Sequence, residues 1–224
     1  MLKQYYQAMH DFGDAIRLKP DFALALSNRG LVHYIQGDYY QAIADYSEAI
    51  RLEPDFADAF NNRAAVYIDL KQYDKAFDDS NEAIRLRPNL EKAFNNRGLA
   101  SYYLNHYDKA IADYTEAIRL GPDFEVAFYN RAHAYYDLKR YDKAVSDYNK
   151  YIRLKPDDAL AFYSRAKAYY HLEKYQTAII DDTEYIRREP NDPDGYSSRA
   201  DCYEKLGNVT AAERDRAKAK ELTK

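Results

Sequence analysis

The chain has 224 residues, and its 46% hydrophobic and 31% charged content is not the composition of a disordered tail. A formal net charge of −4 argues against a nucleic-acid partner, because phosphate backbones require clustered Lys and Arg. No apolar run approaches the roughly 18 residues of a membrane span, and a single cysteine, Cys202, excludes an intramolecular disulfide and a cysteine-built zinc site.

A unit of 34 residues repeats in phase along the sequence. The period is marked by prolines, which fall at Pro20, Pro54, Pro88, Pro122, Pro156 and Pro190. It is marked again by alanines, at Ala8, Ala42, Ala76, Ala110, Ala144, Ala178 and Ala212. A period in this range with apolar residues in phase is typical of stacked helical repeats. We therefore predict an all-α solenoid over residues 1–224.

The units are predicted in chain order. Residues 1–22 supply only the second helix of a half unit. Five full helix pairs follow at 23–56, 57–90, 91–124, 125–158 and 159–192. Residues 193–224 form a sixth unit whose polar last helix is typical of a terminal cap. The first helix carries Tyr5, Met9, Phe12 and Ile16 without a preceding partner, so we expect that surface to be exposed, covered by another molecule, or covered by sequence upstream of Met1.

Each full unit contains two amphipathic helices, because its apolar residues twice follow the i, i+3, i+4, i+7 spacing. In the unit 91–124 the pattern breaks at Asn105, and asparagine tolerates the left-handed conformation of a helix-ending turn. Gly37 and Gly207 stand at equivalent places. The proline near the end of each unit stops the second helix.

The pattern closely resembles the tetratricopeptide repeat family. The matching residues in the unit 91–124 are Phe94, Gly98, Tyr107, Ala110, Tyr114, Ala117 and Pro122. The resemblance covers the whole chain and implies antiparallel helix pairs in a right-handed superhelix, with first helices lining a concave groove. Arg97 is a departure, since many members of the family carry leucine there.

An arginine and an aspartate recur 16 residues apart, one on each helix of a pair. The pairs are Arg29–Asp45, Arg63–Asp79, Arg97–Asp113, Arg131–Asp147, Arg165–Asp181 and Arg199–Asp215. They form either a column of charges for an ionic ligand or internal ion pairs that hold the two helices together. We favour the internal pairs, because a buried charge needs its partner close by.

A column of asparagines is predicted on the groove side of the first helices: Asn28, Asn62, Asn96 and Asn130, followed by Ser164 and Ser198. Asparagine offers a donor and an acceptor together, so it can engage both groups of a peptide bond. The column is similar to the asparagine ladder of O-linked N-acetylglucosamine transferases, which holds substrate backbone. Local hydrogen bonding of the asparagines is the alternative, and both interpretations stay open.

A second column is aromatic and consists of Tyr34, Tyr102, Tyr136 and Tyr170. We expect Leu31, Leu99, Tyr103, Tyr129 and Tyr163 nearby. An aromatic stripe is often core, but Phe60, Phe94, Phe128 and Phe162 already supply a core-facing set. Because tyrosines are enriched at interfaces, we predict that these residues and the asparagines form a peptide-binding surface.

One site where helices pack is not uniform along the chain. Phe12, Tyr46, Tyr114 and Tyr148 occupy it in four units, but Ser80 and Asp182 replace the aromatic in two others. Losing an aromatic's burial removes about 1.5–3 kcal/mol of coupling between neighbours. We therefore predict that the last unit opens first.

Catalytic chemistry is not predicted, since no phosphate loop, nucleophile elbow or set of metal-spaced ligands is present. Cys202 has no evident activator. His133, Lys167, Asp137 and His171 form one candidate polar spot among the tyrosines, for which ordinary groove polarity is the simpler interpretation. We predict neither enzyme activity nor a cofactor or metal site.

The leading hypothesis is a protein-interaction scaffold or adaptor that binds a peptide segment of a partner in its groove. One alternative is a structural module that self-assembles into a homo-oligomer through its N-terminal end. Another is the recruitment domain of a larger enzyme. The cytoplasm is the default location.

Overall fold

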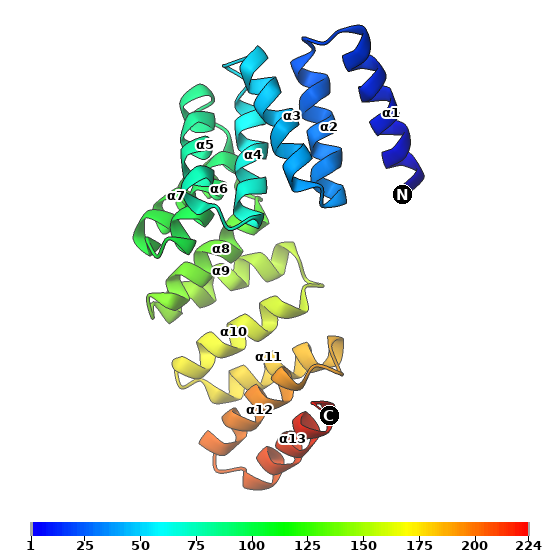
Figure 1. Ribbon diagram of the computed structural model, residues 1–224. Coiled ribbons are helices and arrows are strands. Elements are labelled where there is room, and N and C mark those ends of the chain that lie inside the picture. Colours follow the sequence, from blue (N-terminus) through cyan, green and yellow to red (C-terminus); the bar gives the residue numbers. More distant parts are fainter. Residues whose placement is uncertain (1, 224) are drawn as a thin grey trace. The chain divides into compact units, whose positions relative to one another are not determined.

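The computed structural model describes residues 2–223, with side chains from Tyr6 onward, so Tyr5 lies outside the described side chains. The described chain is all-α and contains 13 helices (Figure 1). The helices are α1 (Leu2–Leu18), α2 (Ala23–Gln36), α3 (Tyr39–Leu52), α4 (Ala57–Asp69), α5 (Tyr73–Leu86), α6 (Glu91–Tyr103), α7 (Tyr107–Leu120), α8 (Glu125–Asp137), α9 (Tyr141–Leu154), α10 (Ala159–His171), α11 (Tyr175–Arg188), α12 (Pro193–Lys205) and α13 (Val209–Leu222). These helices fall within the predicted half unit, full units and final unit, and the division into repeat units stays a prediction.

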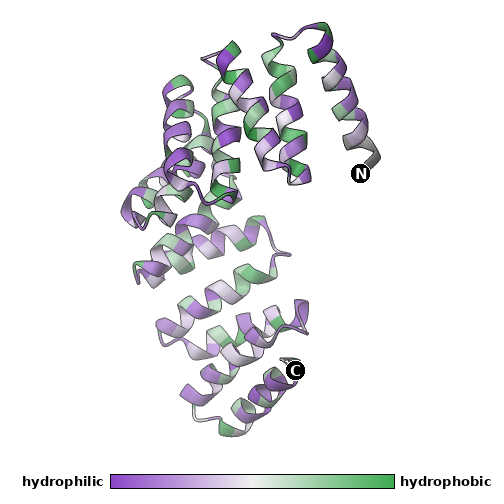
Figure 2. Ribbon diagram, viewed as in Figure 1, coloured by the Kyte–Doolittle hydropathy of each residue, from purple (hydrophilic) through white to green (hydrophobic). Residues whose placement is uncertain are grey.

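The helices group into an N-terminal part, residues 1–122, and a C-terminal part, residues 123–224. Within each part every helix packs against the next, and first helices also pack against first helices: α2 on α4, α4 on α6, and α10 on α12. Each helix carries both hydrophilic and hydrophobic residues, as an amphipathic helix should (Figure 2). That the two parts form one continuous solenoid stays a prediction.

The turn inside each helix pair has the same backbone conformation throughout. Positive φ values occur at Gly37, Lys71, Asn105, Lys139, Glu173 and Gly207, which are spaced by 34 residues. The amide of the next residue donates back into the helix, as from Asp38 to the His33 carbonyl at 2.9 Å, which satisfies a free helix-end acceptor. The turn predicted from glycine and asparagine is confirmed, and lysine or glutamate adopts it in three further units.

Small residues dominate the core and let helices approach closely. A Cβ at Gly98 would lie 2.7 Å from the Tyr114 ring, so glycine is required for this contact. Tyr46, Tyr114 and Tyr148 are fully buried at their shared packing site. The residues that replace the aromatic there, Ser80 and Asp182, are fully buried as well, so these interfaces contain a polar group in place of a ring.

The predicted core stripe of phenylalanines is only partly a core. Phe128 is buried, whereas Phe60, Phe94 and Phe162 are half-buried. Each of the four rings, Phe128 included, lies over the guanidinium of the arginine three residues later, at 5.4–5.8 Å from ring centroid to Cζ. The stripe therefore shields the repeated ion pairs from water at the edge of the core.

The internal ion pairs are confirmed. In all six, the guanidinium binds the aspartate through two nitrogens, at 2.6–3.0 Å. Every one of these aspartates is buried. The third nitrogen of several arginines donates to the preceding unit, as from Arg97 to Asn81 at 2.8 Å and from Arg165 to Asn149 at 2.6 Å. The arginines thus connect units as well as the two helices of one unit.

Candidate groove between the first helices

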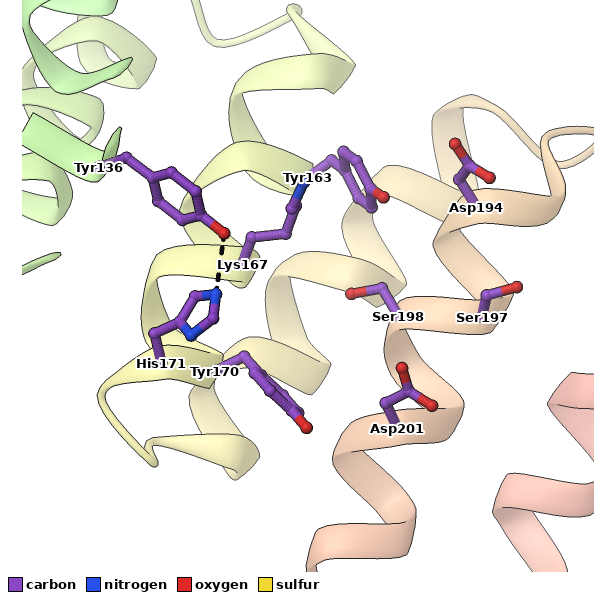
Figure 3. A pocket seen from close by; sticks show the side chains of 9 residues that line it. All are labelled: Tyr136, Tyr163, Lys167, Tyr170, His171, Asp194, Ser197, Ser198 and Asp201. Carbon is purple, nitrogen blue, oxygen red and sulfur yellow. Dashed lines mark hydrogen bonds between the residues drawn. The ribbon is translucent and has the colours of Figure 1, made fainter. Parts of the chain in front are cut away.

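Two adjoining cavities open along the first helices of the C-terminal part. The larger, here called the α10–α12 cavity, has a volume of about 270 Å³ (Figure 3). It is lined by Tyr136, Tyr163, Lys167, Tyr170, His171, Asp194, Ser197, Ser198 and Asp201. The smaller, the α8–α10 cavity, has about 160 Å³ and is lined by His133, Tyr136, Asp137, Tyr148, Ser164 and Lys167. Tyr136 and Lys167 belong to both, so the two cavities form one polar and aromatic groove.

Two tyrosines of the column, Tyr136 and Tyr34, form hydrogen bonds between successive first helices. The Tyr136 hydroxyl lies 2.9 Å from Nε2 of His171, whose ring stacks on Tyr141 at 4.6 Å between centroids. In the N-terminal part, the hydroxyl of Tyr34 donates to Asp69 at 2.8 Å. Both bonds join residues 35 apart, so the geometry repeats with the unit. These rings are held in place before any partner arrives.

Lys167 places its ammonium group between two of the aromatic rings. The Nζ atom lies 5.8 Å from the Tyr136 centroid and 5.5 Å from the Tyr163 centroid, within the range of a cation–π contact. Among the described residues, no carboxylate lies within 4 Å of this ammonium. Burial, together with the charges of Lys167 and Lys139, lowers the pKa of His171. Lys167 is therefore the cation of the α10–α12 cavity at neutral pH.

The opposite wall of this cavity is acidic and comes from α12. Asp194 and Asp201 are exposed on the same face, and Tyr163 and Tyr170 extend toward them from α10 (Figure 3). Asp201 lies 3.3 Å from Arg216, which also binds Glu204. Among the described residues, the Asp194 carboxylate has no ion-pair partner. Burial, followed by the charges of Asp194, Asp182 and Asp192, raises the pKa of Tyr163 to about 12.

Asp182 is fully buried next to this wall. Its Oδ2 lies 3.9 Å from the Cys202 sulfur, and burial raises the pKa of Asp182 to about 7. Burial and the same aspartate raise the pKa of the Cys202 thiol to about 12. The thiol stays protonated, consistent with the small core residue expected from the sequence.

The predicted aromatic residues divide between the two parts. Tyr136, Tyr163 and Tyr170 line the α10–α12 cavity, whereas Tyr129 packs its ring edge against His133 at 4.5 Å between centroids. In the N-terminal part, Leu31 and Tyr103 are exposed by 41% and 48%, enough to contact a partner. The remaining three, Tyr34, Leu99 and Tyr102, are half-buried.

The asparagines make bonds of their own. The side-chain nitrogen of Asn96 donates to the Asn61 carbonyl at 3.2 Å and to Asn61 Oδ1 at 3.0 Å. Asn61 in turn donates to Asn62 at 3.4 Å. Asn28 and Asn130 are half-buried like Asn62 and Asn96. Asn96 therefore forms the local hydrogen bonds of the alternative interpretation, through its side-chain nitrogen. That Asn96 also holds peptide backbone stays a prediction, and it would have to do so through its side-chain oxygen.

The polar spot predicted at His133, Asp137 and Lys167 is one cavity in the structure, and His171 lines the adjoining one. Sequence reasoning missed Asp194, Ser197 and Asp201 because α12 was assigned to a solvated cap. The asparagine column could have indicated that α12 contributes to the groove, because the last position of that column, Ser198, lines the α10–α12 cavity.

Two further properties of the described residues bear on other functions. No group of His, Cys, Asp and Glu is arranged to hold a metal ion within residues 2–223. In the same range, no helix is both long and apolar enough to cross a membrane.

Comparison with known proteins identifies the family. Models described as tetratricopeptide repeat match residues 57–90, 95–159 and 129–193, and one described as TPR repeat matches residues 30–71. The chain belongs to the tetratricopeptide repeat family. Tetratricopeptide repeat proteins are typically non-catalytic modules for protein interaction, with extended binding surfaces made by stacked units. No curated protein matches the sequence.

Solved structures of other tetratricopeptide repeat proteins share the fold. MamA from Desulfovibrio magneticus RS-1, solved from residue 41 to its end, aligns with a TM-score of 0.71 at 19% identity, over 75% of this chain and 94% of the solved MamA chain. A tetratricopeptide repeat protein from Parabacteroides merdae aligns with a TM-score of 0.70 at 23% identity, over 97% and 86%. YrrB, described as having an unusual peptide-binding site, aligns with a TM-score of 0.66 at 21% identity, over 82% and 95%.

Proposed function

We propose that this tetratricopeptide repeat chain is an adaptor that binds an extended peptide segment of a partner protein along its first helices. The observation that carries this proposal is the pair of adjoining cavities on α8, α10 and α12. They combine aromatic rings, held by ring contacts and for Tyr136 also by a hydrogen bond, with exposed polar groups, the combination that favours protein recognition. The unusual peptide-binding site described for YrrB supports the same use of this fold.

The groove suits a peptide better than a small metabolite. Cavities of about 270 and 160 Å³ both lie below the range of pockets that hold drug-sized ligands, roughly 300–1,000 Å³. Each cavity has room for a side chain or two, and the shared residues Tyr136 and Lys167 place the cavities side by side. A chain that passes along the first helices would insert successive side chains into them.

A displayed random peptide library tests this proposal with the purified chain. We expect wild-type protein to capture peptides, and Tyr170→Ala to weaken capture at least tenfold, since truncating an interface aromatic costs 2 kcal/mol or more, on the order of a hot spot. Tyr40→Ala is the matched control, because Tyr40 is 73% exposed on the second helix α3. Circular dichroism melts establish that all three proteins are folded.

The outcomes separate the hypotheses. Equal loss of binding in both tyrosine variants, or capture that Tyr170→Ala leaves intact, contradicts binding at this groove. The predicted asparagine ladder is tested in the same assay by changing Asn62, Asn96 and Asn130 together to alanine. If the folded wild type captures nothing and its mass rises with concentration, self-assembly replaces peptide binding as the function.

A further inference from the structure

The α10–α12 cavity has an uneven distribution of charge. Lys167 lies on the α10 side, over the rings of Tyr136 and Tyr163. Asp194 and Asp201 lie on the α12 side. The guanidinium of Arg216 lies 3.3 Å from the Asp201 carboxylate and partly neutralises its charge. The Asp194 carboxylate has no ion-pair partner among the described residues. The α12 wall is therefore the more strongly charged side, and it is negative.

We propose that this cavity binds a basic side chain of the partner segment, arginine in first place, with its cationic group against Asp194 and beside the tyrosines of α10. The inference rests on the proposed function, since the basic residue belongs to the bound peptide. A guanidinium is planar, stacks on aromatic rings and forms paired hydrogen bonds with a carboxylate. The cavity offers these two kinds of partner on facing helices.

Lys167 shows that the aromatic rings accept a cation. Its ammonium already lies over two of them and has no carboxylate within 4 Å among the described residues. In the free protein it partly neutralises the field of the α12 wall. A bound arginine would meet this charge as a like-charge neighbour, so Lys167 is expected to weaken arginine binding.

An anionic side chain is the opposite possibility, with Lys167 as its anchor. Two features oppose it. His171 has a lowered pKa and adds no positive charge at neutral pH, so Lys167 would act alone. An anion in this space would also face Asp194 and Asp201 across the cavity. The two possibilities predict effects of opposite sign for the same substitutions, which makes them separable.

The test uses the full chain and short Gly-Ser peptides that differ at one central residue: arginine, lysine, citrulline or glutamate. Binding is followed by backbone amide shifts in nuclear magnetic resonance titrations, which detect millimolar affinities. Citrulline has the shape of arginine without its charge. We expect shifts at α10 and α12 with arginine and, more weakly, with lysine, and none with citrulline or glutamate.

Two substitutions are expected to change the affinity for the arginine peptide in opposite directions. Asp194→Asn is expected to weaken arginine binding about tenfold, the effect of losing one charge-assisted hydrogen bond. Lys167→Met is expected to strengthen it several-fold. Asp142→Asn is the matched control, because Asp142 is likewise an exposed first-turn aspartate but lies on α9, outside both cavities.

Three results would overturn the inference: preferred binding of the glutamate peptide, equal binding of arginine and citrulline, or no shift with any peptide. Weaker arginine binding in Lys167→Met would also contradict it. Failure here is distinguishable from failure of the proposed function. If the library assay captures peptides in a Tyr170-dependent way without enrichment of basic residues, the adaptor function stands and only the basic-residue specificity fails.

Discussion

At the scale of single residues, the arginine–aspartate pair is the feature whose removal should cost most. Changing Asp113 to Ala leaves the half-buried Arg97 guanidinium without its carboxylate, with only the Asn81 side chain still accepting. Unpairing a buried charge costs about 3 kcal/mol or more. Urea denaturation should therefore show a clear loss of stability for Asp113→Ala.

The half unit at the N-terminus offers a control for this prediction. Asp11 stands at the position equivalent to Asp113, but it is exposed, accepts a hydrogen bond from Gln7 at 2.8 Å and lies 3.8 Å from the ring of His10. We expect Asp11→Ala to change stability by less than about 0.5 kcal/mol. Similar losses in the two variants would mean that the ion pair has no special role.

A second residue-scale prediction concerns the close contact at Gly98. An added methyl group would meet the Tyr114 ring at 2.7 Å, so the ring or the helix must shift. We expect Gly98→Ala to destabilise the chain by about 1–3 kcal/mol, as overpacking usually does. Gly13→Ala should have no cost or a small gain, because nothing lies within 4 Å of its Cβ position. Thermal melts of both variants compare the two sites directly.

The buried Asp182 predicts a dependence on pH. Its pKa is about 7 in the folded chain and 3.8 in the unfolded chain, so both states are protonated only well below pH 3.8. Between pH 4 and 7 the unfolded state loses its proton first, and stability falls as pH rises. The Asp182→Asn variant does not lose stability in this way, because asparagine does not titrate. The stability of this variant relative to wild type should rise by roughly 2–3 kcal/mol between pH 5 and pH 8, because roughly two pH units of that window lie below the folded pKa and each is worth about 1.36 kcal/mol.

Chemical denaturation of the two proteins at each pH measures this difference. Because all other titrating groups are shared, their contributions cancel in the comparison. An advantage that is the same at pH 5 and pH 8 would show that Asp182 does not titrate in this range.

At the scale of the helix pair, the spacing in the sequence predicted the architecture well, because each pair depends on residues close in the chain. The breaks at Gly37, Asn105 and Gly207 are real, and so is each bond between an arginine and the aspartate 16 residues later. Contacts between units were not predictable in the same way. The reach of Arg97 to Asn81 depends on how neighbouring pairs stack, which no spacing within a unit specifies.

The residues of the groove were likewise only partly predictable from the spacing in the sequence. Tyr136 and Tyr170 were predicted from their column, but the acidic wall of Asp194 and Asp201 was not. Periodicity identifies positions that recur, and these aspartates replace Leu160 and Lys167 of the preceding unit. A site made by departures from the repeat is visible only once the facing helices are placed side by side.

The turn of the helix pair yields a prediction of its own. Glu173 adopts a φ of 58°, which costs a residue with a Cβ roughly 1–2 kcal/mol. Glycine removes that strain but has greater freedom in the unfolded chain. The net effect of Glu173→Gly should be a gain of about 0.5–1 kcal/mol. Gly207→Ala, at the equivalent position with φ 75°, should lose a similar amount. Opposite shifts in melting temperature would meet this prediction, and shifts in the same direction would contradict it.

At the scale of the whole molecule, the composition of the last interface predicts where the chain opens first. In the C-terminal part, the packing site of α9 holds the buried ring of Tyr148, whereas that of α11 holds the buried Asp182. The exposed side of α13 is polar, with Glu213, Arg214 and Lys220 facing solvent. In a repeat protein each unit is stabilised mainly by its neighbours, so a weak interface lets the units beyond it open together.

We therefore expect α12 and α13 to exchange their amide hydrogens faster than α9 and α10 under native conditions. Losing the burial of one aromatic ring, about 1.5–3 kcal/mol, corresponds to roughly a 10- to 100-fold difference in exchange. Hydrogen exchange followed by mass spectrometry resolves these helices. Equal protection would refute the weak interface. Slower exchange of α12 on adding the arginine peptide would connect this local opening to binding, because α12 carries the acidic wall that the peptide is proposed to contact.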